Sequence, residues 1–291
     1  MDIEAVTVDR WYPVATVDDL KNGDVHVTQV LGRRIEYGRT REGQFSARLA
    51  EGTGSPCRSQ TRFHTHWISL GTPPDGLFTI PEFEEPDRRI LGAGSMGAAA
   101  SGLRAIENFL DMAHFPYVHT GILGDEPTTE VRPYRVEFDA VADEILGLGC
   151  VFHQPMAAAT ARGGTEVGYT YRVTAPFVAI LYKTCPSDPA RRDVICLFVQ
   201  PCEEDRCIAH VVLAYIDLVT SDGGLRLFQQ RIFGQDLMIL ANHVPKTLPL
   251  SSAMETPGPA DRLSVAYRRW LRAKGAVYGA HLALDGAPAH G

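Results

Sequence analysis

The pattern of apolar and polar positions divides the chain into blocks of strands and helices. Three short runs near the start, rich in β-branched residues, predict strands over 25–31, 35–39 and 44–49. Residues 50–66 are polar and show no regular period, so we expect irregular structure there. Residues 77–86 contain two prolines and several acids, which predicts a connection between two domains.

A longer series of antiparallel strands is predicted between residues 133 and 219. Apolar and polar residues alternate over 167–173, as in a strand with one buried face. Three further runs, 178–182, 194–199 and 208–216, are almost wholly apolar and rich in β-branched and aromatic residues. These runs predict strands in the interior of the protein.

Helices are predicted on both sides of this series. Leu103, Ile106, Leu110 and Ala113 recur every three or four residues, and Pro116 is expected to end that helix. A second helix is predicted over 223–242, from Leu225, Phe228, Ile232 and Ile239. A third begins near Asp261, a suitable N-cap, with inward-facing Leu263, Ala266, Tyr267, Trp270 and Leu271. A helix, then strands, then helices is an α+β order.

Charge and composition narrow the class of protein. The chain has 291 residues and a net charge of −7, which argues against a surface for nucleic acid or an anionic membrane. No apolar run is long enough to span a bilayer, and the acidic start does not resemble a signal peptide. Six scattered cysteines in a chain of this length do not indicate a disulfide framework. We therefore expect a cytoplasmic protein.

The candidate chemistry lies in the segment from Asn108 to His119. His114 and His119 are five residues apart, and Asp111 precedes the first by three. Asp236 falls on the predicted apolar stripe of a later helix, where an ionised carboxylate is costly unless it is paired or bound to metal. Two imidazoles and one carboxylate with open positions are the ligand set of non-haem Fe(II) oxygenases, so the residues indicate a divalent metal site.

These residues resemble a known family. The spacing Asn108-x2-Asp111-x2-His114-x4-His119, followed late by Gln235-Asp236, is similar to the mononuclear iron site of Rieske-type non-haem iron oxygenases. The opening run 11–14 and the later 31–33 resemble the start of the Rieske domain. The resemblance implies that His114, His119 and Asp236 bind Fe(II), with O2 as co-substrate. It also implies that Asp111 is the bridge through which electrons arrive, and that Asn108 is a polar residue near the iron.

The chain departs from the family where the electron-relay cluster should be. A Rieske [2Fe–2S] cluster needs two cysteines and two histidines, but Cys57 is the only cysteine in the first 149 residues. His64 and His66 have no thiolate partner there and are interpreted as a loop remnant, with a metal role as the less favoured alternative. Residues 50–66 then correspond to a shortened cluster-binding region. We therefore expect iron but no cluster, with electrons from NAD(P)H supplied through a partner reductase that carries the [2Fe–2S] centre.

That combination resembles a narrower branch of the family, the oxygenases that N-demethylate 7-methylxanthine in bacterial caffeine degradation. It implies a reaction from 7-methylxanthine to xanthine and formaldehyde, in a catalytic domain of helix-grip type over residues 81–291. Residues 1–80 would form a small, degenerate Rieske-like β domain. The substrate would be a small aromatic heterocycle, and other subunits of an oxygenase complex are possible partners.

Alternatives stay open. The same chemistry could act by O-demethylation or hydroxylation on another aromatic, an alkaloid or a steroid. The chain could also be a non-catalytic helix-grip subunit, although a carrier has no use for all four metal-site residues. The aromatic residues expected on the strands could line a flat pocket or fill an ordinary core; they are Tyr169, Tyr171, Tyr182, Phe198 and Tyr215.

Three further patterns are given weaker interpretations. The run Gly92–Gly97 fits G-x-G-x-x-G, but the chain does not alternate strands and helices as a dinucleotide-binding fold requires. Cys202 and Cys207 are expected to be free thiols. The basic group Arg268, Arg269, Arg272 and Lys274 is interpreted as the solvated face of the last helix, with a docking surface for an acidic ferredoxin-like partner as the alternative.

Overall fold

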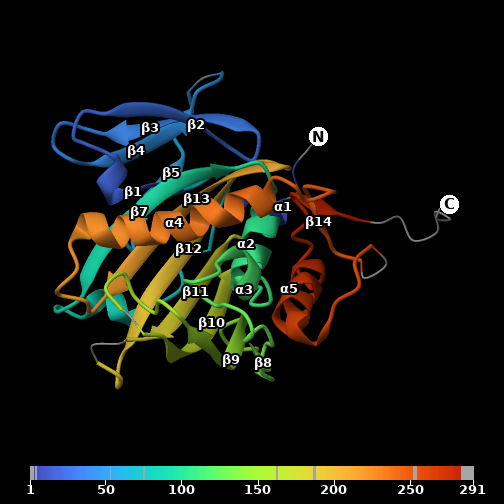
Figure 1. Ribbon diagram of the computed structural model, residues 1–291. Coiled ribbons are helices and arrows are strands. Elements are labelled where there is room, and N and C mark those ends of the chain that lie inside the picture. Colours follow the sequence, from blue (N-terminus) through green and yellow to red (C-terminus); the bar gives the residue numbers. More distant parts are fainter. Residues whose placement is uncertain are drawn as a thin grey trace.

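A curved antiparallel sheet forms the body of the protein (Figure 1). The computed structural model describes residues 3, 5–52, 54–74, 76–161, 163–185, 188–251 and 254–282. Within them, strands follow the order β7-β13-β12-β11-β10-β9-β8. The sheet is made of β7 (Arg89–Ala98), β8 (Arg135–Asp139), β9 (Glu144–Gln154), β10 (Thr165–Ala175), β11 (Val178–Thr184), β12 (Arg192–Glu203) and β13 (Arg206–Tyr215).

Both faces of the central strands are buried, which explains their almost continuous apolar sequence. On one face Leu181 and Leu197 belong to the core beneath the helices. On the other face Ile180 and Phe198 pack with Trp67 from the N-terminal part of the chain. The predicted strands 167–173, 178–182, 194–199 and 208–216 are all confirmed.

Helices cover the inner face of this sheet, with α4 running across its strands (Figure 1). Ser101 caps α2 (Gly102–Leu110) by accepting a hydrogen bond from the backbone nitrogen of Arg104 at 3.2 Å. The other helices are α1 (Ala5–Val8), α3 (Phe115–Val118), α4 (Asp222–Leu240) and α5 (Arg262–Ala273). The predicted α+β class, an antiparallel sheet wrapped over a long helix, is confirmed.

The prediction that Pro116 ends the first helix was wrong. That helix stops earlier, at Leu110, with Asp111 as its C-cap. Pro116 instead lies in the first turn of α3, where a missing backbone N–H costs nothing. The chain therefore leaves α2 after Leu110 and forms a separate single-turn helix, α3, before His119.

The buried stripe of α4 is displaced from the predicted one. Leu225, Gln229, Phe233, Asp236 and Leu240 are buried, whereas Ile239 is 41% exposed. The inner stripe contains two polar residues, Gln229 and Asp236. A prediction based on apolar residues alone therefore selects neighbouring positions, such as Ile239, instead. Asp236 nevertheless faces inward, as predicted.

The N-terminal strands form two small sheets, and Trp67 of one of them packs on the outer face of the main sheet (Figure 1). The predicted strands correspond to β2 (Val25–Val30), β3 (Arg33–Arg39) and β4 (Phe45–Leu49). The second sheet has the order β1-β6-β5. It contains β1 (Tyr12–Thr16), β5 (Arg58–Arg62) and β6 (Thr65–Ser69).

Residues 50–66 were predicted to be irregular, but β5 and the start of β6 lie within them. Phe63 and His64 form the turn of this hairpin, with φ of 52° and 56°. Polar residues on β5 hid the strand, because most of its side chains are exposed. The predicted domain boundary near residue 80 falls in the connection from β6 to β7 and stays a prediction. Side chains of both parts share one apolar core, which includes Val30 and Val199.

The glycine-rich run 92–97 lies within β7, at the edge of the main sheet, and forms no phosphate-binding loop. A Cβ atom at Gly94 would lie 2.8 Å from the side chain of Gln230 on α4. Gln230 donates to the carbonyl of Ala93 at 2.8 Å. Gly94 also has a φ of 123°, which residues with a side chain rarely adopt, so its backbone conformation favours glycine here.

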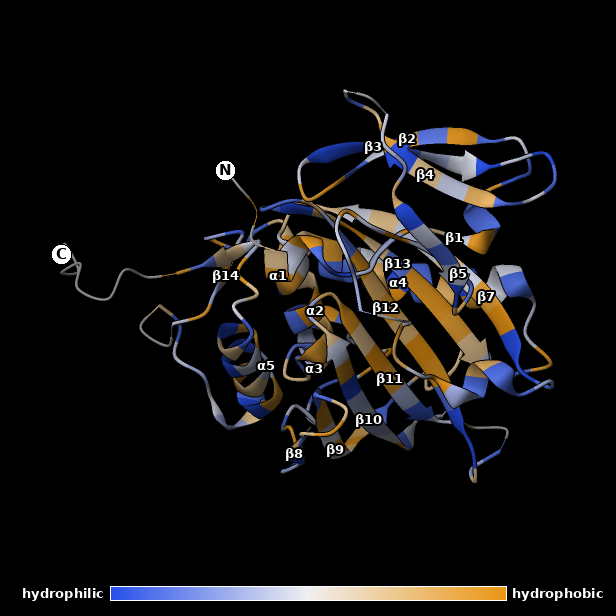
Figure 2. Ribbon diagram, turned by 180° about the vertical axis from the view of Figure 1, so that it is seen from behind, coloured by the Kyte–Doolittle hydropathy of each residue, from blue (hydrophilic) through white to orange (hydrophobic). Residues whose placement is uncertain are grey.

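Two short elements close the chain, β14 (Leu248–Pro249) paired in parallel with β15 (Ala280–His281). The coloured ribbon in Figure 2 shows apolar strands of the main sheet seen from behind. None of the helices in the described ranges combines the length and apolar character needed to cross a membrane.

Candidate metal centre

Two histidines and an aspartate converge beneath α4. His114 and His119 are the N-cap and C-cap residues of the single-turn helix α3, so its one turn brings both rings to the same side. Their Nε2 atoms are 3.1 Å apart. Oδ1 of Asp236, from α4, lies 3.4 Å from Nε2 of His114 and 3.0 Å from Nε2 of His119. Within the described ranges, these three residues form the group whose ligand atoms could hold one metal ion.

Each imidazole is held from its outer side. Nδ1 of His114 lies 2.9 Å from Oδ2 of Asp111. Nδ1 of His119 lies 2.9 Å from Oε1 of Gln235. Both partner atoms are acceptors, so each Nδ1 donates its proton outward. When the rings are neutral, their Nε2 lone pairs consequently point inward, toward each other and toward Asp236.

That arrangement fits a bound cation. Oδ1 of Asp236 is buried and makes no hydrogen bond to any part of the chain described here, despite its short distances to both rings. Three electron-rich atoms at this separation repel one another unless a positive charge lies between them. Two imidazole nitrogens and one carboxylate oxygen suit a divalent transition metal, and the outer partners provide the orienting contacts such ligands need.

The electrostatics favour positive charge at the same point. Burial opposes protonation of His114, but its hydrogen bond to Asp111 and the nearby Asp236 raise its pKa to about 9. Burial likewise opposes ionisation of Asp236, yet the two nearby imidazoles lower its pKa to about 2. Asp111 is also held ionised, since His114 and backbone N–H groups outweigh burial and lower its pKa.

A buried cavity, which we call the inner cavity, opens on the centre from the sheet side. It has a free volume of about 60 Å³, enough for a few water molecules. Its walls are aromatic and aliphatic side chains with a few polar groups. The lining residues are Asn108, Phe109, His114, Phe115, His119, Leu123, Tyr169, Tyr171, Leu181, Lys183, Ile195, Leu197, Val211, Tyr215, Phe228, Gln229, Ile232, Phe233 and Asp236.

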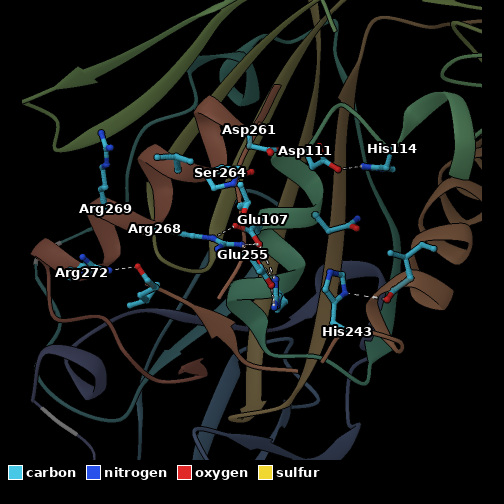
Figure 3. A pocket seen from close by; sticks show the side chains of 17 residues that line it. Glu107, Asp111, His114, His243, Glu255, Asp261, Ser264, Arg268, Arg269 and Arg272 are labelled. Atoms are coloured by element: carbon cyan, nitrogen blue, oxygen red, sulfur yellow. Dashed lines mark hydrogen bonds and ion pairs between the residues drawn. The ribbon is translucent and has the colours of Figure 1, made fainter. Parts of the chain in front are cut away.

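A second, wider cavity, the outer cavity, reaches the centre from the other side. Its volume is about 550 Å³. Figure 3 shows Asp111 and His114 at one end of it, and Arg269 and Arg272 at the other. The lining residues are Arg104, Glu107, Asn108, Asp111, His114, Ile239, His243, Leu250, Glu255, Thr256, Pro257, Asp261, Ser264, Val265, Arg268, Arg269 and Arg272. Asp111 thus faces a space large enough for a protein loop.

Comparison with known proteins identifies the family. The family described as vanillate O-demethylase oxygenase C-terminal domain matches residues 98–276. A probable methylxanthine N7-demethylase, NdmC, from Pseudomonas sp. (strain TJI-51) is 50% identical over 94% of this chain and 96% of its own length. The chain belongs to the Rieske-type oxygenase family that includes the methylxanthine N-demethylases. Its predicted class, an oxidoreductase of the non-haem iron monooxygenase type, is confirmed.

More distant members of this oxygenase family share the fold. The methylxanthine N1-demethylase NdmA of Pseudomonas putida is 24% identical over 90% of this chain and 87% of its own length. The solved structure of Pseudomonas putida CBB5 NdmA with caffeine superposes with a TM-score of 0.74 at 18% identity, covering 93% of this chain and 92% of that one. Dicamba monooxygenase bound to dicamba gives a TM-score of 0.70 at 15% identity, covering 94% of this chain and all of that one.

The structure brings the predicted site residues of this family member together. His114, His119 and Asp236 converge, Asp111 contacts His114, and Asn108 lines both cavities. The contact of Gln235 with His119 was not foreseen, although the residue stands beside Asp236 in the sequence. Gln229 and Lys183 were also missed. A lysine that continues the inward alternation of an apolar strand was the available signal for Lys183.

The aromatic residues divide between the two alternatives for them. Tyr169, Tyr171 and Tyr215 line the inner cavity. Tyr182 and Phe198 lie on the other face of the sheet and pack with the N-terminal part, because strand alternation reverses their direction. They belong to an ordinary core.

The basic residues of α5 were only partly a solvated face. Arg269 and Arg272 are exposed, but Arg268 pairs with Glu107 and Glu255 inside the outer cavity. Lys274 pairs with Asp143. Cys202 and Cys207 are free thiols, as predicted. His66 is buried and donates to or accepts from Thr61 at 2.7 Å, and neither it nor His64 joins a metal-ligand group within the described ranges.

Proposed function

We propose that this protein is an oxygenase component that removes the N7-methyl group of 7-methylxanthine, giving xanthine and formaldehyde. The carrying observation is the convergence of Nε2 of His114, Nε2 of His119 and Oδ1 of Asp236 at the end of a buried, tyrosine-lined cavity. The 50% identity to a probable methylxanthine N7-demethylase supports the substrate.

The residues divide the work. His114, His119 and Asp236 would hold Fe(II), and Asp111 and Gln235 keep both rings oriented toward it. The chemistry that Fe(II) supplies in such a site is activation of O2 for hydroxylation of a methyl C–H bond. The resulting N-hydroxymethyl group loses formaldehyde and leaves a free N–H. Overall the N-methyl compound, O2, two electrons and two protons give the demethylated ring, formaldehyde and water.

The inner cavity provides the environment for this reaction. Phe115, Tyr169 and Phe233 make its walls largely apolar and give flat surfaces for a heteroaromatic ring. Gln229 is buried there, and its side-chain amide makes no hydrogen bond within the described ranges, so this amide is available to a polar ring edge. A bicyclic ring is larger than the free volume, so we expect lining side chains to move when substrate enters.

Electrons must come from another protein in this proposal, because the sequence has no cysteine and histidine set for its own cluster. Asp111 lies between His114 and the outer cavity, where it can bridge the centre and a partner. Arg269 and Arg272 are exposed, and their positive charges suit the acidic surface of a ferredoxin-like domain, although Arg272 also donates to the carbonyl of Leu250. We propose a reductase carrying a Rieske [2Fe–2S] centre, reduced by NAD(P)H, as that partner.

A second candidate keeps the chemistry and changes the substrate. The matching family domain is described for a vanillate O-demethylase, which favours an aryl methyl ether as the alternative. A non-catalytic subunit is disfavoured. A carrier would gain nothing from three converging ligand atoms, and keeping these polar groups buried lowers the stability of the fold.

The test combines metal analysis with turnover. The purified protein should hold about one iron per chain and no acid-labile sulfide. With a Rieske-type reductase, NADH and O2, it should release formaldehyde from 7-methylxanthine faster than from 1- or 3-methylxanthine or from vanillate. Zinc retained without activity after iron reconstitution, or faster turnover of vanillate, would contradict the proposal. Turnover with a flavin reductase alone would contradict the partner.

A further inference from the structure

Lys183 is a buried amine in the wall of the inner cavity. It follows Leu181 on the helix-facing side of β11, and both residues line the cavity. The residue is only 5% exposed, and its Nζ donates a hydrogen bond to the backbone carbonyl of Ala157. Within the described ranges no carboxylate lies within ion-pair distance of it. An ammonium group has three donors, so two remain for another acceptor.

The neighbours of Lys183 do not satisfy it. Asp193, its partner on β12, lies too far for an ion pair, and its Oδ1 accepts the backbone N–H of Ile216 at 3.0 Å. The hydroxyl of Tyr169, its partner on β10, accepts a hydrogen bond from Nε2 of Gln154 at 2.6 Å. A buried ammonium without enough acceptors costs folding free energy. Burial accordingly lowers the pKa of Lys183 to about 8, although Asp193 partly offsets this.

The position of Lys183 separates it from the metal centre. The three converging ligand atoms come from helices α3 and α4 and their ends, whereas Lys183 projects from the middle strands of the sheet. A ring held between them would present one edge to the metal and another to the lysine. Tyr171 and Tyr215 line the same wall. Their hydroxyl groups make no hydrogen bond within the described ranges, so two further polar groups are free there.

We propose that Lys183 selects the substrate by donating hydrogen bonds to a ring carbonyl oxygen on the edge away from the reacting methyl group. This inference rests on the proposed function and names the feature its substrate must carry. Dioxygenated purines have such acceptors on several edges. Rings without one leave the buried amine unpaired, and sites of this kind reject such rings far more strongly than apolar pockets do.

A purely structural role makes a different prediction. If Lys183 only ties the loop at Ala157 to β11, its loss should weaken the fold and every ligand alike. If it binds substrate, its loss should act on one class of ligands and leave the iron in place. The two roles therefore separate in a ligand panel.

The experiment measures equilibrium binding to the iron-loaded protein without O2. The probes are 7-methylxanthine, 7-methylhypoxanthine, which lacks one ring oxygen, and 7-methylpurine, which lacks both. We expect the unaltered protein to bind 7-methylxanthine most tightly. Lys183→Met should weaken that binding by about 10- to 100-fold, the usual effect of losing a hydrogen bond to a charged group, and bind 7-methylpurine as before or better. Lys21→Met makes the same change at an exposed lysine outside both cavities; it is the matched control and should preserve the preference.

The outcomes are distinguishable. If the unaltered protein binds none of the probes, the proposed substrate is wrong, whatever Lys183 does. If it binds 7-methylxanthine and Lys183→Met binds it equally well, or loses all probes to the same degree, the role of Lys183 is wrong. Should Lys183→Met fail to fold, Lys183→Gln replaces it: the preference for 7-methylxanthine should fall because the charge is lost, and an unchanged preference would overturn the inference. Equal affinity of the unaltered protein for 7-methylxanthine and 7-methylpurine would overturn the inference without any variant.

Discussion

Oε1 of Gln235 lies 2.9 Å from Nδ1 of His119, in the same relation that Asp111 has to His114. One ring is thus held by a neutral amide and the other by a carboxylate. Both contacts fix the ring and direct its Nε2 inward, but only the Asp111 contact adds negative charge. Because Asp111 lines the outer cavity, that charge lies on the side from which a partner would approach.

Gln235→Leu should lower iron affinity by about 10- to 100-fold, because the His119 ring loses the contact that fixes its orientation and tautomer. Gln230→Leu is the matched control, since Gln230 lies on the same helix but contacts Ala93 instead. Iron titration with a competing chelator measures both. Equal affinity in the two variants would show that the Gln235 contact does not support the centre.

His114→Ala and His119→Ala should each abolish iron retention while leaving the fold largely intact, because each removes one of the three converging atoms. His243→Ala should retain iron, since His243 lines the outer cavity and bonds to the backbone of Ile239 instead. Elemental analysis and circular dichroism measure the two properties. Full iron in either of the first two variants means that the ligands are wrongly assigned.

Asp111→Asn should separate electron transfer from metal binding. The amide can keep the size and one acceptor toward His114, but it removes the negative charge beside the outer cavity. We expect most of the iron and the substrate affinity to remain, and nearly all turnover with the reductase to be lost. Asp236→Asn should instead weaken iron binding itself. Near-normal turnover in Asp111→Asn would remove the relay role.

Glu107→Gln should destabilise the protein by about 1 to 3 kcal/mol, because Glu107 is buried and pairs with two arginines, while burial raises its pKa and so offsets part of the gain from ionising it. Arg104, on the same helix α2, lies 3.3 Å from Oε2 of Glu107, and Arg268, on α5, lies 2.9 Å from it, so the Arg268 pair ties α2 to α5. Glu36→Gln removes an exposed pair with Arg48 and should cost less than about 1 kcal/mol. Urea unfolding of both variants measures the difference, and equal midpoints would contradict it.

The sequence predicted which side chains converge at the centre and most of the strands, because the family resemblance and the alternation of apolar residues carry that information. It could not place Gln235 against His119, since that contact joins α4 to α3 across more than a hundred residues. It misjudged the inner stripe of α4 because Gln229 and Asp236 are polar residues kept inside. The β5–β6 hairpin escaped notice for the opposite reason, because β5 is a mostly exposed strand without an apolar period. Prediction was least accurate where polar residues occupy positions that packing alone would make apolar.

Lys183→Met should make the free protein more stable at pH 7, at the expense of the substrate preference proposed above. Burial lowers the pKa of Lys183 from 10.5 to about 8, so between these values the unfolded chain binds more protons than the folded one. The stability of the unaltered protein should therefore rise across this pH window, whereas Lys183→Met has no such group. At pH 7 the full shift corresponds to about 3 kcal/mol in favour of the variant, reduced by the lost bond to Ala157. Denaturant unfolding at pH 7 and pH 10 measures the difference, which should shrink at the higher pH. If the difference in unfolding free energy were the same at both pH values, burial of the charged Lys183 would not destabilise the folded protein, and its place in the cavity would need another explanation.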